Sequence, residues 1–166
     1  MNKTRKMVIT ALFTAFVCVS TMIIKIPTPT NGYVNLGDAM VLVSAYILGP
    51  VWGTFAAGVG SMLADLLSGY GFYAPATLII KAAVAAAAFG LAFVLGKKIT
   101  VSSVKYIVSG VIAEIIMVGG YLLFESTILG EGAAALASVP GNIFQAVVGV
   151  ILSILLMKVK ALKNIQ

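Results

Sequence analysis

The chain has 166 residues, of which 61% are hydrophobic and only 10% are charged. A soluble domain usually carries about 25% charged residues, so this composition excludes an ordinary water-soluble protein and predicts a single membrane domain over residues 1–166. The one cysteine, Cys18, excludes an internal disulfide, and the lack of histidine argues against zinc and redox-metal sites, so we expect no metal and no cofactor.

The first predicted element is a helix over Met7–Ile24, which follows a short basic start. A basic start before an apolar run is also typical of a signal peptide. This run is longer than the roughly 7–15 residues of a signal-peptide core, and no small-residue cleavage site follows it. We therefore expect a retained membrane helix.

The next predicted elements are a loop over Lys25–Asn35 and a short helix over Leu36–Leu48. Gly49-Pro50 predicts a tight turn, and Val51–Ser68 predicts a third helix. The short second helix has fewer residues than the roughly 20 that cross a bilayer. Two counts therefore compete: six membrane-spanning helices, or five with a re-entrant second segment.

Three longer apolar runs predict helices over Ala74–Gly96, Val104–Leu129 and Ala133–Met157. Pro75 suits the first turn of the helix that contains it. Pro140 lies inside the last run and predicts a kink there. The pattern as a whole predicts an all-α membrane protein.

The placement of basic residues predicts the orientation of the bundle. Nine of them form three groups before the first helix, between the fourth and fifth, and after the last: Lys3, Arg5, Lys6; Lys97, Lys98, Lys105; and Lys158, Lys160, Lys163. Six crossings place all nine on one side, which the positive-inside rule makes cytoplasmic. We therefore expect six helices in the plasma or inner membrane with both termini cytoplasmic. This topology also explains the net charge of +6, so we expect no nucleic-acid partner.

Ionisable side chains inside the helices lie towards the outer half of the bundle. Asp65 ends a stripe of small residues, Gly53, Ala57 and Ser61, whose four-residue steps let helices approach closely. Lys81 reaches a similar depth in the following helix. Because either charge alone in lipid costs several kcal/mol, an ion pair between Asp65 and Lys81 is expected, either purely structural or in contact with a ligand.

The last two helices carry polar groups at helical spacing. Glu114 and Tyr121 share one face of the fifth helix, and Asn142 and Gln145 share one face of the sixth. Buried amides and carboxylates in a membrane either bridge helices or line a cavity. Their depth, level with Asp65, favours a cavity.

The outer loops add aromatic and polar side chains at the membrane boundary. Such aromatics usually anchor the protein at the interface, and they can also stack on a flat ligand ring. A pocket capped by loops suits a small, flat, hydrogen-bonding solute. The expected substrate-binding residues are Tyr33, Asn35, Asp38, Asp65, Tyr73, Lys81, Glu114, Tyr121, Asn142 and Gln145.

Taken together, these features resemble the substrate-binding S components of energy-coupling factor (ECF) vitamin transporters. The resemblance covers essentially the whole chain and is strongest in VNLGDAMVLVSAYILGPVWGTFAAGVGSMLADLLSGYGFYAPATLIIKA, Val34–Ala82, with its Leu-Gly-Pro turn, its Gly/Ala-rich third helix and its Pro-led fourth helix. The chain looks most similar to the branch that holds carriers of riboflavin and of pyridoxine-like or pyrimidine vitamin precursors.

The resemblance implies high-affinity binding of a vitamin from outside the cell, in a pocket made by the first loop and the outer ends of helices 4–6. It implies that Ala11 and Ala15, a small-x-x-x-small pair on the first helix, dock onto a transmembrane coupling subunit. Two cytoplasmic ATPases would drive that subunit. This sequence has no Gly-x-x-x-x-Gly-Lys-Ser/Thr phosphate loop of its own, which agrees with such a division of labour.

Two other functions compete with this interpretation. A structural or assembly membrane protein would use its interior charges only to bridge helices. An intramembrane enzyme would use Asp65, Glu114 or Lys81 as acid or base, but no nucleophile paired with a base is visible in the sequence.

Overall fold

The computed structural model describes residues 2–97, 102–159 and 162. Five long helices make up most of this part of the chain: α1 Lys3–Ile23, α2 Gly37–Leu67, α3 Ala74–Gly96, α4 Ser102–Leu123 and α5 Val139–Met157. Each of the five, with the short helical turns that extend α4 and precede α5, is long and apolar enough to cross a membrane. These helices confirm the prediction of a mostly helical membrane protein.

Helix α1 begins at the Asn2 cap, whose side chain accepts a hydrogen bond from the Arg5 amide at 2.9 Å. Its inward face repeats at helical spacing and includes the buried side chains of Phe13 and Val17. The opposite face is exposed and apolar. Because α1 packs against the bundle along one face only, the other remains open to lipid or to a partner.

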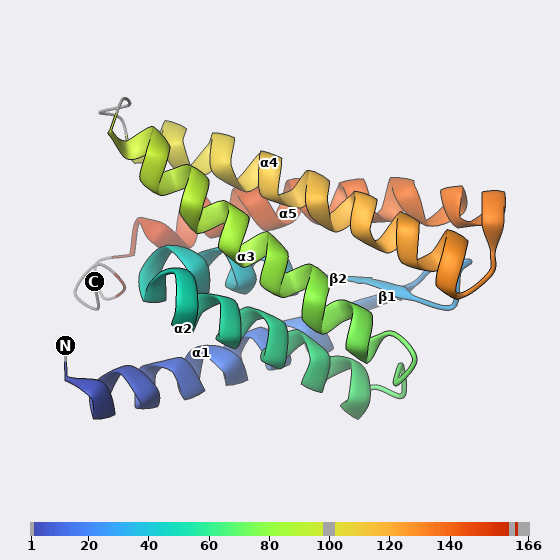
Figure 1. Cartoon of the computed structure of the whole chain (residues 1–166), viewed down its shortest axis with the longest axis horizontal. Helices are drawn as coiled ribbons and strands as arrows, with labels where there is room; N and C mark the ends of the chain where they lie inside the picture. Colours follow the sequence, from blue (N-terminus) through green and yellow to red (C-terminus); the bar gives the residue numbers. More distant parts are fainter. Residues whose placement is uncertain (1, 98–101, 160–161, 163–166) are drawn as a thin grey trace.

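Helix α2 contains a break at Gly49, where φ is 82° and ψ is −170°. Glycine adopts this backbone conformation at little cost, and Pro50 then suits the first turn of a new helical segment. The Ser44 hydroxyl lies 3.3 Å from the Gly53 carbonyl oxygen. Nine residues of unbroken helix would rise about 13.5 Å, so the chain must turn back at Gly49. Figure 1 shows α2 folding back on itself.

Small residues let the second half of α2 pack tightly on three sides. Gly53 faces the first half of α2, and a Cβ there would lie 2.6 Å from the Ser44 carbonyl oxygen. Gly58 faces α3, and Gly60 faces α1, where a Cβ would lie 2.6 Å from the Thr14 carbonyl oxygen. The predicted small-residue stripe is buried along its length, so α2 forms the centre of the bundle.

The two ends of the bundle differ in character. At one end lie the start of α1, the end of α3 and the end of α5 (Figure 1). At the other lie the hairpin of β1 (Lys25–Pro27) and β2 (Tyr33–Asn35), the α2–α3 turn and two short helices, η1 (Phe124–Ile128) and η2 (Gly132–Ser138). Lys98, Lys160 and Lys163, which contribute to the predicted basic end, lie outside the described residues.

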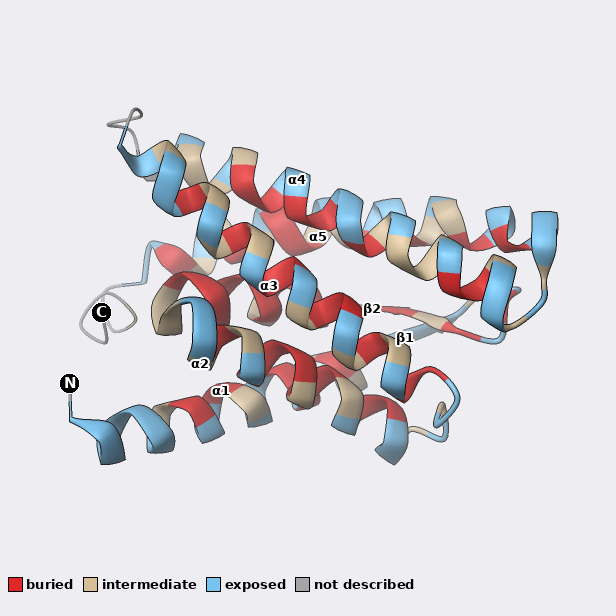
Figure 2. Cartoon of the chain, in the orientation of Figure 1, coloured by how far each residue is buried: buried red, intermediate tan, exposed pale blue. Residues whose placement is uncertain are grey.

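The outer surface of the bundle is apolar. Buried residues face inward on every helix, while exposed faces look outward (Figure 2). Those exposed faces carry large apolar side chains such as Phe16, Phe93, Ile115 and Phe144. A soluble protein rarely exposes so large an apolar surface, and lipid is the solvent that accommodates it.

Two local predictions need correction. The segment Lys25–Asn35 is not wholly a loop, because its ends pair as antiparallel strands in the register Lys25↔Asn35, Ile26↔Val34 and Pro27↔Tyr33. Pro140 does not kink a long helix. It lies in the first turn of α5, where its missing N–H breaks no hydrogen bond, and the 3₁₀ turn of η2 precedes it.

Candidate functional site

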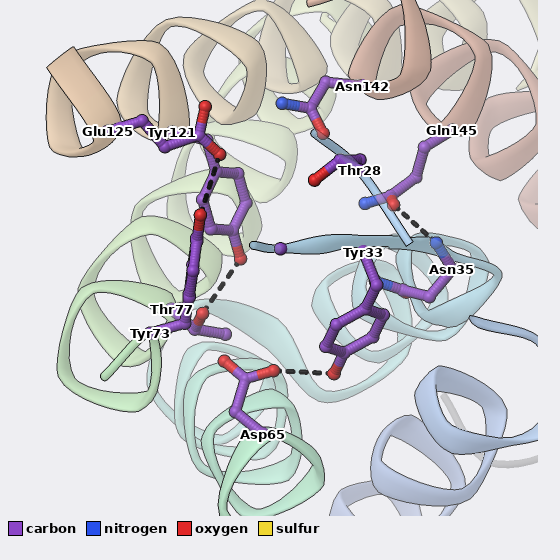
Figure 3. A pocket seen from close by; sticks show the side chains of 11 residues that line it. Thr28, Tyr33, Asn35, Asp65, Tyr73, Thr77, Tyr121, Glu125, Asn142 and Gln145 are labelled. Atoms are coloured by element: carbon purple, nitrogen blue, oxygen red, sulfur yellow. Dashed lines mark hydrogen bonds between the residues drawn. The ribbon is translucent and has the colours of Figure 1, made fainter. Parts of the chain in front are cut away.

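A cavity lies at the hairpin end of the bundle, between the β-hairpin and the helical elements α2, α3, α4, η1 and α5 (Figure 3). The space bounded by its walls is about 360 Å³ up to the open mouth, but the centre of a water molecule can reach only about 20 Å³ of it. That room suits one or two ordered waters. The walls comprise Thr28, Gly32, Tyr33, Asn35, Asp65, Tyr73, Thr77, Tyr121, Glu125, Asn142 and Gln145.

One side of the cavity is closed by a hydrogen bond between the hairpin and α2. The Tyr33 hydroxyl donates to Asp65 Oδ1 at 2.6 Å, while Oδ2 of Asp65 is buried without a hydrogen-bond partner among the described residues. Burial, followed by the neighbouring Asp65 carboxylate, raises the pKa of Tyr33 well above its ordinary value. Tyr33 therefore remains a hydroxyl donor that holds the hairpin against the bundle.

The opposite side is closed by a cluster around Glu125. Its Oε1 accepts from the Thr30 hydroxyl at 3.2 Å, and its Oε2 accepts from the Ser138 hydroxyl at 2.5 Å. The Tyr73 hydroxyl lies 2.6 Å from the Thr30 carbonyl oxygen and 3.2 Å from Glu125 Oε1. Burial is the main cause that raises the pKa of Tyr73. Together these contacts attach the hairpin loop to α3 and η1.

A charged network lies directly beneath the cavity. Lys81 on α3 forms a buried ion pair with Asp38 at the start of α2. Asp38 Oδ2 also accepts a hydrogen bond from Gln145 Nε2 at 2.5 Å. Gln145 Oε1 in turn accepts one from the backbone N–H of Asn35 at 2.7 Å. The network fixes Gln145 at both ends of its amide and connects three helices to the hairpin.

This network corrects the predicted partner of Lys81. The sequence predicted an Asp65–Lys81 pair, whereas the structure pairs Lys81 with Asp38 and gives Asp65 the Tyr33 hydroxyl. Asp38 is completely buried, although its position after a polar loop suggested the outer surface. Because β2 leads the chain inward before α2 begins, the first turn of α2 lies below the hairpin at the depth of Lys81.

Glu114 lies deeper and does not line the cavity. Its side chain is buried, and neither carboxylate oxygen has a hydrogen-bond partner among the described residues. It is close enough to Asp38 and Lys81 for their charges to act on it. Glu114 therefore belongs to the charged layer under the cavity.

Seven of the ten residues expected to bind substrate line the cavity, and three lie under it. The seven are Tyr33, Asn35, Asp65, Tyr73, Tyr121, Asn142 and Gln145, and the three are Asp38, Lys81 and Glu114. The sequence interpretation did not assign Thr28, Gly32, Thr77 or Glu125 to the site. Thr77 precedes Lys81 by one helical turn, so the two share a face of α3, and this spacing could have identified Thr77 from the sequence.

The side chain that is freest to meet a ligand is Asn142. It lines the cavity from α5, opposite Asp65 on α2 (Figure 3), and has no hydrogen-bond partner among the described residues. Tyr121 and Thr77 share a hydrogen bond of 3.0 Å across the wall. The Thr77 hydroxyl also lies near Asp65. The cavity thus offers an uncommitted amide, two carboxylates and several hydroxyls between tyrosine rings.

Ala11 and Ala15 lie far from this chemistry. Both are exposed on the outer face of α1, flanked by the apolar side chains of Leu12 and Phe16, which are each 53% exposed. A flat strip of small residues on a membrane helix permits close approach of another helix. Ala11 and Ala15 therefore form part of the exposed surface of α1 and do not line a pocket.

Comparisons with known proteins show the family to which the chain belongs. A family model described as the S component of an ECF-type riboflavin transporter matches residues 1–164. An uncharacterised protein from the gap 3′ region of Pyrococcus woesei is 38% identical over 137 residues, which are 82% of this chain and 88% of that protein.

Two solved structures share the fold. The S component of a bacterial ECF transporter gives a TM-score of 0.75 at 24% identity, with 98% of each chain covered. The S component for biotin of an ECF-type ABC transporter gives a TM-score of 0.53 at 18% identity, with 96% of this chain and 95% of that chain covered. Since the family model spans nearly the whole sequence, the chain belongs to the S components of ECF-type riboflavin transporters, which are membrane-embedded substrate-binding subunits and not enzymes.

Proposed function

We propose that the protein binds riboflavin in the cavity at the hairpin end and presents it for uptake. The observation that carries the proposal is the convergence of Asp65, Asn142 and Tyr121 on one cavity within an apolar bundle. A flavin ring edge carries both N–H donors and carbonyl acceptors, which an amide and a carboxylate can satisfy. Pyridoxine-like and pyrimidine ligands present similar edges and are the other ligands to test.

Binding requires the hairpin to move. The cavity admits the centre of a water molecule to only about 20 Å³, far less than a ring system needs. The Tyr33–Asp65 and Thr30–Glu125 hydrogen bonds join the loop to the bundle. A ligand that offers donors to these two carboxylates replaces those bonds, so opening leaves no carboxylate oxygen newly unpaired.

We further propose six membrane segments, with both termini in the cytoplasm of a multi-pass plasma-membrane protein. The reversal at Gly49 divides α2 into segments 37–48 and 50–67, which supports six over five. Lys97 and Lys105 lie at the end of the bundle opposite the hairpin, as the positive-inside rule requires. Labelling single cysteines with an impermeant reagent tests this: Asn31→Cys should react from outside, Lys97→Cys only after permeabilisation, and the reverse result would contradict it.

The proposed partners are a transmembrane coupling subunit and two cytoplasmic ATPases. The exposed Ala11–Ala15 strip of α1 supports docking to the coupling subunit, because it permits close helix contact. The sequence contains no phosphate loop, so ATP hydrolysis of that type must come from elsewhere. ATP-dependent uptake should therefore need the complete complex, whereas binding should need only this chain.

A riboflavin titration of the purified protein tests the proposed ligand. Binding should quench flavin fluorescence with one ligand per chain. Asn142→Ala should weaken binding about tenfold, since it removes a hydrogen-bonding amide from the cavity. Ile143→Ala, on the adjacent lipid-facing position, is the matched control and should bind as the wild type does. Failure of riboflavin to bind, or equal loss in both variants, would contradict the proposal.

A further inference from the structure

The hydrogen bonds beneath the cavity run in a single direction. The Lys81 ammonium can only donate, and the carboxylate of Asp38, its buried partner, can only accept. Because Asp38 Oδ2 also accepts, the Gln145 side chain must turn its Nε2 towards it. Gln145 Oε1 then faces the hairpin, where the backbone N–H of Asn35 donates to it at 2.7 Å (Figure 3). The ion pair therefore sets the orientation of the Gln145 amide.

This orientation acts directly on the cavity wall through Asn35. The Asn35 side chain lines the cavity, and its Oδ1 accepts from the backbone N–H of Gly37 at 2.8 Å. The backbone N–H that Gln145 holds thus belongs to a residue that faces the ligand space. If Gln145 turned over, its NH₂ group would face this N–H, and two donors cannot bond to each other.

Tight packing leaves Gln145 no other way to satisfy its amide. The side chains of Asp38, Lys81 and Gln145 are all almost fully buried, so water cannot replace a lost hydrogen bond between them. Gly149 lies one helical turn after Gln145 on α5, and a Cβ there would lie 2.9 Å from the Asp38 Cβ. Helices α5 and α2 therefore approach closely at the point where Gln145 meets Asp38.

We propose that Asp38, held by Lys81, is a positioning residue for ligand binding. It orients the Gln145 amide and, through that amide, the part of the cavity wall formed by Asn35. The inference rests on the proposed function and deepens it, because it gives the charged layer a role in binding besides stability. If Asp38 served only to neutralise Lys81, the direction of these hydrogen bonds would not affect binding.

The substitution Asp38→Asn should reverse the Gln145 amide. Each oxygen of Asp38 faces one donor, and the charge of Lys81 should retain the one oxygen of the new amide. The new NH₂ group then faces Gln145 Nε2, so Gln145 turns and the Asn35 N–H loses its acceptor. Riboflavin affinity of the purified full-length protein should fall at least about tenfold. Glu114 remains close enough for its charge to act on Lys81.

The double variant Asp38→Asn, Gln145→Glu is the matched test, because it exchanges the two groups and keeps the net charge. The new amide at position 38 donates to the new carboxylate at position 145, whose other oxygen accepts from the Asn35 N–H. This variant should bind riboflavin within about threefold of the wild type. Gln145→Glu alone sets two carboxylates against each other, so it should bind at least about tenfold more weakly.

Hydrogen exchange of the unliganded protein provides a second measurement. The Asn35 amide should exchange slowly in the wild type and in the double variant, and about tenfold faster in each single variant. A general loss of stability would also speed exchange in the helices. The proposal instead predicts that the change is concentrated in the hairpin peptide that contains Asn35.

Every outcome of these measurements decides a question. The positioning inference is wrong if the double variant fails to fold or binds no better than Asp38→Asn, or if the single variants match the wild type in affinity and exchange. Should the single variants unfold, comparison of the double variant with the wild type still decides. If riboflavin does not bind the wild type, the proposed function fails, whereas exchange at Asn35 still tests the orientation of Gln145.

Discussion

At the scale of single residues, the Asp38–Lys81 pair shows how a charge is tolerated inside the bundle. Each side chain is almost fully buried, and each would be costly in an apolar surrounding without its partner. Gln145 adds a hydrogen bond to the same carboxylate. The pair therefore fixes α2 relative to α3 and orients an amide of the cavity wall.

Removing one member of this pair should destabilise the protein strongly. Lys81→Met leaves Asp38 charged and buried, and we expect a loss of about 3–5 kcal/mol in unfolding free energy. The double variant Asp38→Asn, Lys81→Met removes both charges and should recover most of that loss. Unfolding in detergent at a fixed pH measures both. Equal destabilisation in the single and double variants would show that the two charges do not interact.

The pKa of Tyr33 predicts a pH dependence in the alkaline range. Because its folded-state pKa is raised, the stabilisation it gives is fully present below the unfolded phenol pKa of about 10 and is lost as pH rises above that value. Tyr33→Phe lacks this phenol, so its stability should fall less steeply above about pH 10. Parallel alkaline slopes in the wild type and in Tyr33→Phe would argue against the buried Tyr33–Asp65 contact.

At the scale of elements, the close contact within α2 depends on Gly53. A Cβ at this position would lie 2.6 Å from the Ser44 carbonyl oxygen and 2.8 Å from the Ala45 Cα. Both are backbone atoms that cannot rotate away. Gly53→Ala should therefore destabilise the protein by about 1–3 kcal/mol, as overpacking does.

Gly90 on α3 provides the matched control, because a Cβ there meets no atom within 4 Å. Gly90→Ala should leave the stability unchanged or raise it by up to about 1 kcal/mol through helix propensity. Thermal unfolding of both variants compares them directly. If Gly53→Ala were as stable as Gly90→Ala, the fold-back of α2 at Gly49 would be wrong.

Elements whose signal is local could be predicted from the sequence. The ends of α3 agree with the predicted Ala74–Gly96 helix, because Pro75 marks its first turn and a polar stretch of sequence follows its end. The β-hairpin could not be predicted, since two strands of only three residues each are too short to give a periodic pattern. Pro140 was misjudged because the 3₁₀ turn before it, GAAALAS, carries no charged residue that would mark it off from the helix that follows.

Some residues of the candidate site could also be predicted from the sequence, and others could not. Asp65 and Asn142 could be predicted because a polar group inside an apolar run is conspicuous. The partner of Lys81 could not, because it depends on how deep Asp38 is carried by the hairpin. Thr28 and Gly32 escaped notice since they are ordinary loop residues that only tertiary packing brings to the cavity.

At the scale of the whole molecule, the two proposed functional surfaces of the chain are separate. The cavity lies under the hairpin, whereas Ala11 and Ala15 lie on the exposed face of α1. Ligand binding and partner docking should therefore be separable by mutation.

Bulky side chains on the α1 strip should abolish uptake without weakening ligand binding. In the double variant Ala11→Leu, Ala15→Leu, the larger side chains block close contact with another helix, while the distant cavity is unchanged. Ala83→Leu, Ala86→Leu, at exposed positions of α3, is the matched control and should transport normally. Vitamin uptake and binding measured on the same preparations distinguish the two. Normal uptake by the α1 variant would place the docking surface elsewhere.

The central claim is that the polar cavity beneath the β-hairpin holds the vitamin. The most direct measurement is a crystal structure of the protein determined from crystals grown in the presence of riboflavin. Flavin density should lie between Asp65 and Asn142, with the loop of residues 28–33 displaced from its contacts with Asp65 and Glu125. Density only on the lipid-facing surface between α4 and α5, with the hairpin unmoved and no flavin beneath it, would contradict the claim.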